Sequence, residues 1–243
     1  MGRAFEYRKA TKFARWDRMA KAFTRAGREI LIAVKQGGPN LDANLALRRA
    51  VQNAKAVQMP KDRIDAAIKR ASSKDTADLK EITYEGMALH GVALVVETTT
   101  DNHTRTAANV RAAFNKKGGS LGTQGMHDFI FTKKGVFQIK EEYVSDLESF
   151  EFSLIDDGLE SIEKDEEDGI NYLLVYTSFA DFGKMQEALE RLKIPVEKAH
   201  FERVPSVFRE ISQEQADEVY ELIDRLEQDD DVSDVFHNMK ILA

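Results

Sequence analysis

The stretch "SQEQADEVYELIDRLEQ" (residues 212–228), followed by "VSDVFHNMKIL" (residues 232–242), decides how this chain of 243 residues is organised. The first part has the three- and four-residue apolar spacing of an amphipathic helix, and the second has the β-branched and aromatic content of a strand. A final helix and strand need a sheet to join. The segments before them indicate which sheet still lacks a helix and a strand.

The segment directly before this tail already forms a closed unit. From Val136 it reads as strand ("VFQIK"), helix (about 144–156), strand ("LESIEK"), acidic turn ("DEEDG", 165–169), strand ("NYLLVYTS"), helix (about 180–192) and strand ("VEKAHFERV"). This β-α-β-β-α-β order is the ferredoxin-like plan. Just before it, "HDFIFT" (127–132) is expected to form a separate strand, with 133–135 as a tight turn.

Residues 81–132, in contrast, contain a β-β-α-β pattern without a partner. "GVALVVETT" is a buried strand, and "DNHTRTAANVRAAFNKKGG" is a helix capped by Asn102 or Thr104 and ended by Gly118 and Gly119. We expect the tail to return to this segment. The predicted fold is therefore α+β with three lobes: a basic helical domain (1–75), a discontinuous α/β middle domain (81–132 plus 205–243) and an inserted ferredoxin-like domain (133–204), with 72–80 as a linker.

Three helices are predicted in the N-terminal lobe. The first has an apolar stripe opposite its basic residues, and "QGGP" (36–39) ends it. A second helix is expected within 41–58, and a third starts at Pro60 with Asp62 and Asp65 in its first turn. The stripe of the first helix consists of Phe13, Trp16, Ala20, Phe23, Gly27, Ile30 and Val34, and that of the second of Leu41, Leu45, Leu47, Val51, Ala54 and Val57.

Charge is distributed very unevenly along the chain. Residues 1–80 hold 19 Lys and Arg against 8 Asp and Glu, although the whole chain has a formal net charge of -7. Such an asymmetry indicates a polyanionic partner for the basic part, because cations that neutralise phosphates release counterions. The candidate nucleic-acid-binding residues are Arg8, Lys12, Arg15, Arg18, Lys21, Arg25, Arg28, Lys55, Lys61, Lys69, Arg70, Arg105, Lys116 and Lys117.

Each of these basic segments also has a simpler interpretation. A run of charge on one helix is usually just a solvated helix face. The glycine-rich "KKGGSLGTQG" (116–125) matches neither a P-loop nor a dinucleotide-binding pattern, and a helix end followed by a turn explains it better. Lys116 and Lys117 beside exposed amides still remain possible phosphate contacts.

The sequence offers little for catalysis or metal binding. Cysteine is absent, and Asp101 and His103 in "TTDNHTRT" are better explained by a strand-to-helix turn than by acid-base chemistry. The acidic "DEEDG" lacks the alternating spacing of a calcium loop. We therefore predict no catalytic residue, no metal, no cofactor, no small-molecule substrate and no enzymatic activity.

Composition indicates a globular protein: 42% of its residues are hydrophobic and 32% are charged. No apolar run is long enough to span a bilayer, and no signal peptide is recognisable. A cytoplasmic location without a membrane partner is expected, whereas the oligomeric state is not predicted.

Four segments together resemble one known family: "AKAFTRAGREILIAVKQGG" (20–38), "AKAVQMPKDRIDAAIKRA" (54–71), "YEGMALHGVALVVETTTDNHTRTAANVRAAFNKKGGSLGTQG" (84–125) and "FTKKGV" (131–136). They are similar to the YebC/PmpR family, and the resemblance extends from about Lys21 to the C-terminus. Many members begin with Gly-His-Ser-Lys-Trp, where this chain has "MGRAFEYRKATKFARW". Contacts that the family makes through that segment are therefore not transferred.

The resemblance implies three domains, a cytoplasmic location, no cofactor and no enzymatic activity. Members are described as probable transcriptional regulators, and a mitochondrial relative is a translational activator. We expect a nucleic-acid-binding regulator of gene expression: first a DNA-binding transcriptional regulator, alternatively an RNA- or ribosome-associated translation factor. An enzyme or small-molecule sensor built on the ferredoxin-like domain is the least favoured alternative.

Overall fold

The computed structural model describes residues 15–73, 78–167 and 169–242, with side chains described from residue 21 onward. The backbone packs into two compact units, one combining Met1–Lys74 with Lys133–Glu202 and the other combining Asp75–Thr132 with Arg203–Ala243. This division into two units does not test the three predicted domain boundaries, which remain a prediction. Among the residues described, three short 3-10 helices, Leu89–Gly91, Glu141–Tyr143 and Ile155–Asp157, connect longer elements.

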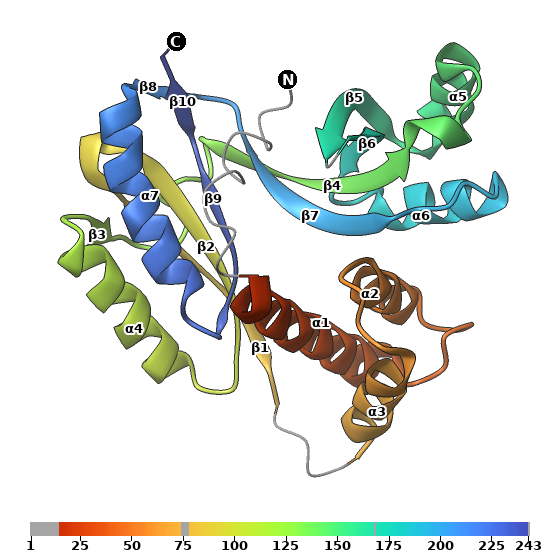
Figure 1. Cartoon of the computed structure of the whole chain (residues 1–243), viewed down its shortest axis with the longest axis horizontal. Coiled ribbons are helices and arrows are strands. Elements are labelled where there is room, and N and C mark those ends of the chain that lie inside the picture. The colour runs from red at the N-terminus through yellow and green to blue at the C-terminus, as the bar shows by residue number, and fades with distance from the viewer. Residues whose placement is uncertain (1–14, 74–77, 168, 243) are drawn as a thin grey trace. The chain divides into compact units, whose positions relative to one another are not determined.

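The first unit begins with three helices, α1 (Arg15–Gly37), α2 (Leu45–Ala56) and α3 (Lys61–Ala71) (Figure 1). Gly38 follows α1 with a φ of 81°, a left-handed conformation that glycine adopts easily. The second helix starts four residues later than its apolar pattern indicates, because the Asn44 side chain accepts a hydrogen bond from the Leu47 amide as its N-cap. Leu41 and Val57 are consequently exposed, outside the helix.

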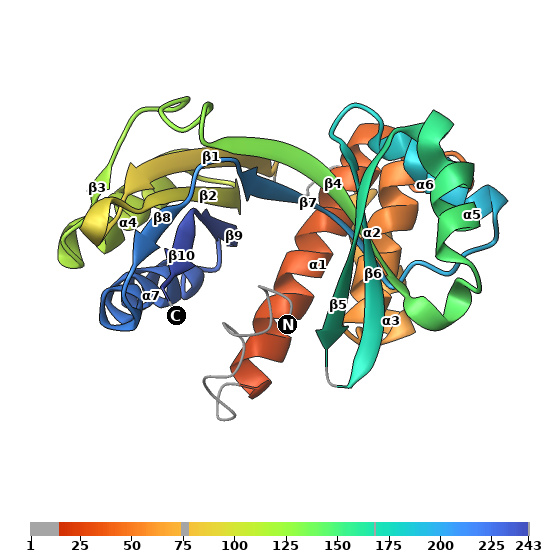
Figure 2. The ribbon, with the colours of Figure 1, turned by 90° about the horizontal axis from the view of Figure 1, so that it is seen from above.

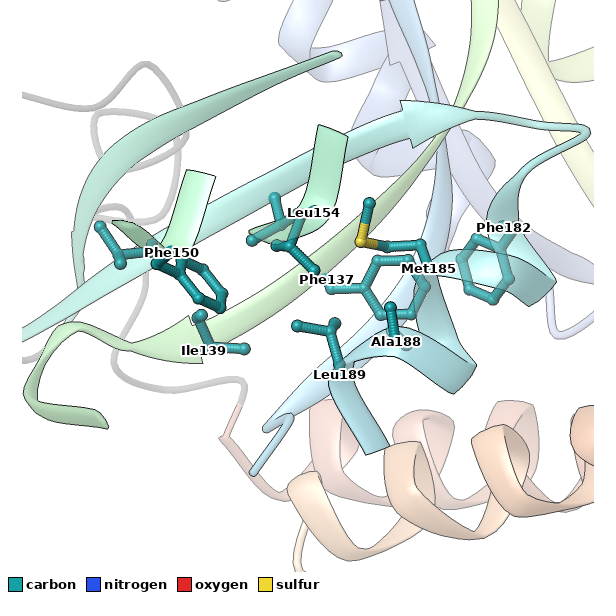
Figure 3. Close-up of a cluster of buried hydrophobic side chains, with 11 residues drawn as sticks. Phe137, Ile139, Phe150, Leu154, Phe182, Met185, Ala188 and Leu189 are labelled. Atoms are coloured by element: carbon teal, nitrogen blue, oxygen red, sulfur yellow. The ribbon is translucent and has the colours of Figure 1, made fainter. Parts of the chain in front are cut away.

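The rest of the first unit has the predicted ferredoxin-like order: β4 (Phe131–Lys140), α5 (Leu147–Leu154), β5 (Leu159–Glu167), β6 (Ile170–Ser178), α6 (Phe182–Arg191) and β7 (Lys198–Pro205). The four strands form one sheet in the order β5-β6-β4-β7. Figure 2 shows α5 and α6 together on one face of this sheet. Phe137 and Ile139 of β4, Phe150 and Leu154 of α5, and Met185 and Leu189 of α6 form the buried core between them (Figure 3).

One predicted boundary is wrong. Residues 127–132 do not form a separate strand, and 133–135 do not form a turn, because β4 runs without interruption from Phe131 to Lys140. Gly135 is a strand residue here. A Cβ at this position would lie 2.3 Å from the Phe182 ring, so the glycine makes room for the first turn of α6.

The second unit contains β1 (Lys80–Met87), β2 (Ala93–Thr100), α4 (His103–Lys116), the short β3 (Ser120–Leu121), β8 (Arg209–Ile211), α7 (Gln213–Glu227), β9 (Val232–His237) and β10 (Met239–Ile241). Its main sheet has the order β3-β1-β2-β9. Since β9 pairs antiparallel with β2, for example His237 with Leu94, the predicted return of the tail to the middle domain is confirmed. The single strand expected at the end is divided at Asn238, and β10 pairs in parallel with β8.

The helical lobe packs directly on the ferredoxin-like domain, which the sequence did not predict. Asn53 of α2 has its side-chain amide 2.8 Å from the Ala199 carbonyl, and its side-chain oxygen accepts a hydrogen bond from the Ala199 amide. Arg48 forms an ion pair with Glu190 of α6, 3.3 Å apart. The chain therefore brings a basic lobe and an acidic one into contact within one unit.

Candidate nucleic-acid interface

Helix α1 carries the most regular group of predicted cations. Lys21, Arg25 and Arg28 fall within an arc of about 60° when successive residues are placed about 100° apart. That arc lies opposite Ile30 and Val34, which are buried in the helical lobe. The three cations are half-buried, and Lys21 and Arg28 interact with other groups of the chain. Their common side makes α1 the best-defined basic surface of the lobe.

The remaining N-terminal candidates either precede this segment or lack a described side chain. Arg8 and Lys12 lie outside the described residues, and Arg15 and Arg18 lie in the described backbone of α1 without described side chains. The predicted stripe positions Phe13, Trp16 and Ala20 are in the same situation. For the part that is described, residues 21–73 hold 11 Lys and Arg against 4 Asp and Glu.

Helix α3 distributes its cations over two different sides. Lys61 and Lys69 are exposed and lie about 80° apart on the helix, and the exposed Asp62 and Asp65 occupy the same side. Two carboxylates between two ammonium groups weaken the local attraction for phosphate. Arg70 is exposed on the opposite side and interacts with other groups of the chain.

Lys55 lies at the end of α2, on the side that meets the ferredoxin-like domain. It borders a shallow hollow together with Arg48, Glu190 and Glu197. Lys55 is exposed, but two carboxylates border the same hollow. Lys55 therefore lies beside carboxylates rather than on a purely basic surface.

Arg63 is a cation of the helical lobe that is not among the residues predicted from the sequence. It is exposed on α3, and its guanidinium carbon lies 5.6 Å from the centre of the Phe23 ring of α1. Because Arg63 precedes Arg70 by seven residues, the two arginines share one side of the helix. That seven-residue spacing was the available signal, and the contact with Phe23 depends on the tertiary structure.

The candidates in the middle domain lie on α4 and belong to the second unit. Arg105 has one guanidinium nitrogen 3.0 Å from the Asp101 carboxylate and 2.7 Å from that of Asp231. Asp231 is buried, and it also accepts hydrogen bonds from Thr106 and Thr100. Burial alone would raise the pKa of the Asp231 carboxyl, but the hydrogen bonds from Arg105 and Thr106 hold it below its ordinary value. Arg105 thus has a structural role within its own domain.

Lys116 and Lys117 differ from each other. Lys117 forms an ion pair with Glu221 of α7, with 2.6 Å between the nitrogen and the oxygen, whereas Lys116 is exposed. The amides that follow them are already occupied: Gly122 donates to the Glu85 carbonyl and Gly125 to the Glu85 carboxylate, each at 2.8 Å. The glycine-rich segment is a helix end and a turn held by Glu85, in keeping with the simpler interpretation.

Within the described part of the chain, no group of three or more His, Cys, Asp or Glu side chains is arranged to hold a metal ion. The helices described here also include none that is long and apolar enough to cross a membrane.

Comparison with known families identifies this architecture. Residues 3–74 match the family described as "TACO1/YebC protein N-terminal domain", and residues 79–239 match "TACO1/YebC second and third domain". The chain belongs to the TACO1/YebC family. The boundary between the two matches lies between the helical lobe and β1.

Several relatives are similar over their full length. A "probable transcriptional regulatory protein" of Flavobacterium johnsoniae is 49% identical over 240 residues, covering 99% of both chains. One of the same name from Myxococcus xanthus is 52% identical, covering 98% of this chain and 100% of the relative. The crystal structure of a conserved hypothetical protein, Aq1575 from Aquifex aeolicus, is 35% identical with a TM-score of 0.78, covering 92% of this chain and 91% of that one. The three-lobed α+β fold is therefore that of the TACO1/YebC family, in which these two relatives carry the name "probable transcriptional regulatory protein".

Proposed function

We propose that this TACO1/YebC family chain is a cytoplasmic, nucleic-acid-binding regulator of gene expression that contacts phosphates through α1, with duplex DNA as its first target. The observation that carries the proposal is the side of α1 that holds Lys21, Arg25 and Arg28, away from the buried stripe. Cations arranged in this way neutralise successive phosphates and release their counterions. The regulatory names of the relatives support the same function.

A second candidate is a translation factor that binds ribosomal RNA. On α3, the carboxylates of Asp62 and Asp65 lie beside the exposed lysines, a poor arrangement for reading base edges in a major groove. Binding would then depend on the phosphate backbone and on shape, which RNA offers as well as DNA.

The proposal is tested by neutralising α1. We expect the five-residue change of Arg15, Arg18, Lys21, Arg25 and Arg28 to Gln to lower nucleic-acid affinity by more than about 100-fold at 0.1 M salt. The logarithmic salt dependence of binding should flatten by about one for each phosphate contact removed. Fluorescence anisotropy with duplex DNA and with ribosomal RNA fragments measures both quantities.

A matched control removes the same number of positive charges elsewhere. Lys134, Lys164, Lys184, Arg191 and Lys240 each form an ion pair with a neighbouring carboxylate. Changing these five to Gln should alter affinity only a few-fold. Equal losses in two folded variants would show that net charge, rather than α1, causes binding. Crosslinking in cells followed by sequencing of the bound nucleic acid then separates DNA from ribosomal RNA.

A further inference from the structure

Three phenylalanine rings and two cations gather at one end of the ferredoxin-like core. Phe179 lies in the turn after β6, and its ring centre is 4.9 Å from that of Phe201 on β7. Phe201 in turn lies 4.5 Å from Phe182, the first residue of α6. Two cations contact these rings: the Lys133 ammonium is 4.8 Å from Phe179 and 4.9 Å from Phe201, and the Arg49 guanidinium is 5.1 Å from Phe201. We call these five residues the aromatic–cation cluster.

The cluster extends from the core to the surface. Phe182 is 5% exposed and stacks on Phe137, so it belongs to the core (Figure 3). Phe179 is 53% exposed, although its ring leans on Phe201. The core is thus complete without the outer ring. Phe179 is therefore a surface ring that its contacts with Phe201 and Lys133 hold in place.

Another exposed phenylalanine of the same domain provides a contrast. Phe152 of α5 is 79% exposed, and no described cation stacks on it. Lys133 therefore distinguishes Phe179 from an ordinary exposed ring.

Asp181, two residues after Phe179, has its carboxylate matched by neighbouring groups. Asp181 accepts a hydrogen bond from the Ser178 hydroxyl at 2.8 Å and forms an ion pair with Lys184 at 3.0 Å. Its charge is matched locally. Lys133 therefore places a cation beside the exposed ring at this end of the acidic domain.

We propose that Phe179, supported by Phe201, is a stacking site for an unpaired base of single-stranded nucleic acid, with Lys133 positioned for the adjacent phosphate. This inference rests on the proposed function and adds a second mode of contact to it. Sites that bind single strands combine aromatic rings, on which bases stack, with cations that contact the backbone. A hydrophobic pocket on a protein partner fits less well, because it would have to strip water from the Lys133 ammonium without offering it a negative charge.

The decisive measurement compares two phenylalanines. We expect Phe179→Ala to lower affinity for a short single strand of RNA or DNA by about tenfold, and Phe152→Ala to leave it unchanged. Duplex of the same sequence should bind Phe179→Ala as it binds the unchanged protein, because its bases are paired. Parallel RNA and DNA strands show which of the two supplies the base.

A second variant tests stacking itself. Phe179→Trp should retain affinity, and its tryptophan fluorescence should be quenched when the single strand binds. Phe152→Trp provides the control for the signal of the natural Trp16. Lys133→Gln should flatten the logarithmic salt dependence by about one.

The outcomes separate this inference from the proposed function. If Phe179→Ala, folded by circular dichroism, binds single strands as tightly as Phe152→Ala does, the stacking site is refuted while phosphate binding by α1 stands. If the unchanged protein binds no nucleic acid at all, both fail together. Equal quenching of Phe179→Trp and Phe152→Trp, each beyond the quenching of Trp16 in the unchanged protein, would equally refute a specific site.

Discussion

Some cations of the N-terminal helices differ in their surroundings from cations of the middle domain, although the sequence patterns are similar. On the N-terminal helices, Arg25, Lys61 and Lys69 form no ion pair with any residue that the structure describes. In the middle domain, Arg105 is bound to Asp101 and Asp231, and Lys117 to Glu221. The difference shows that a helical pattern of cations does not reveal which of them the fold pairs with a carboxylate.

This contrast also explains how an acidic protein can carry a basic surface. The acidic residues belong to the later part of the chain, and many of them neutralise cations within that part, as the pairs on α4 do. Exposed surface pairs of this kind contribute little to stability. The pair of Arg105 with the buried Asp231 is the exception, because removing Arg105 leaves a buried carboxylate without its countercharge.

The largest effect on stability is expected from Asp231→Ala. The change leaves the guanidinium of Arg105 and the hydroxyls of Thr100 and Thr106 without this acceptor, and should lower the free energy of unfolding by about 2–3 kcal/mol. Urea denaturation measures the change, with the exposed Asp224→Ala on α7 as its control. Nucleic-acid affinity of the folded variant should stay the same. If Asp231→Ala folds but binds nucleic acid more weakly, the charges of the middle domain also take part in binding, and their contrast with the N-terminal cations fails.

A smaller effect follows from acidification. Burial lowers the pKa of His237 to about 4, below the ordinary value of about 6.5. Between these values the unfolded chain binds a proton that the folded chain does not, so stability falls as the pH falls. The loss from pH 7 to pH 5 should be about 2 kcal/mol.

The variant His237→Gln isolates this contribution, because glutamine does not titrate. We expect its unfolding free energy to depend less on pH over the same range, whereas His103→Gln, exposed on α4, should behave like the unchanged protein. An identical pH dependence in all three proteins would exclude His237 as the cause.

The smallest effect is expected from the two exposed lysines of α3. Lys61→Gln with Lys69→Gln should lower affinity for nucleic acid only a few-fold, because Asp62 and Asp65 on the same side already weaken the attraction of these lysines for phosphate. The matched pair Lys116→Gln with Lys117→Gln in the middle domain should have no measurable effect. Anisotropy titrations at one salt concentration measure both. A larger loss of affinity from Lys116→Gln with Lys117→Gln would show that the middle domain contributes more to binding than α3 does.

Most of the fold could be predicted because its signals are local. The capping residue Asn102, the buried Val110 and Phe114 of α4 and the ferredoxin-like order of elements along the chain all follow from residue types and their periodicity. The prediction failed at residues 127–135. There the backbone amide of His127 donates to the buried Glu85 carboxylate, 42 residues earlier in the sequence, and Gly135 continues a strand instead of ending one.

The candidate site was less predictable than the fold. Periodicity places Lys21, Arg25 and Arg28 on one side of α1, since that requires only the helix repeat. It cannot show that Arg105 is held by Asp231, which is 126 residues away in the sequence. Nor can it bring Arg49, Lys133, Phe179 and Phe201 together from four different segments.

The sequence by itself determined the helices, the closed ferredoxin-like unit, the returning tail and the basic character of the N-terminal lobe, because hydrophobic periodicity and charge act over a few neighbouring residues. Only the tertiary structure decided which cations are matched by carboxylates and which rings reach the surface. Ion pairing and burial depend on distances of a few ångströms between residues far apart in the chain, and those distances are set by packing.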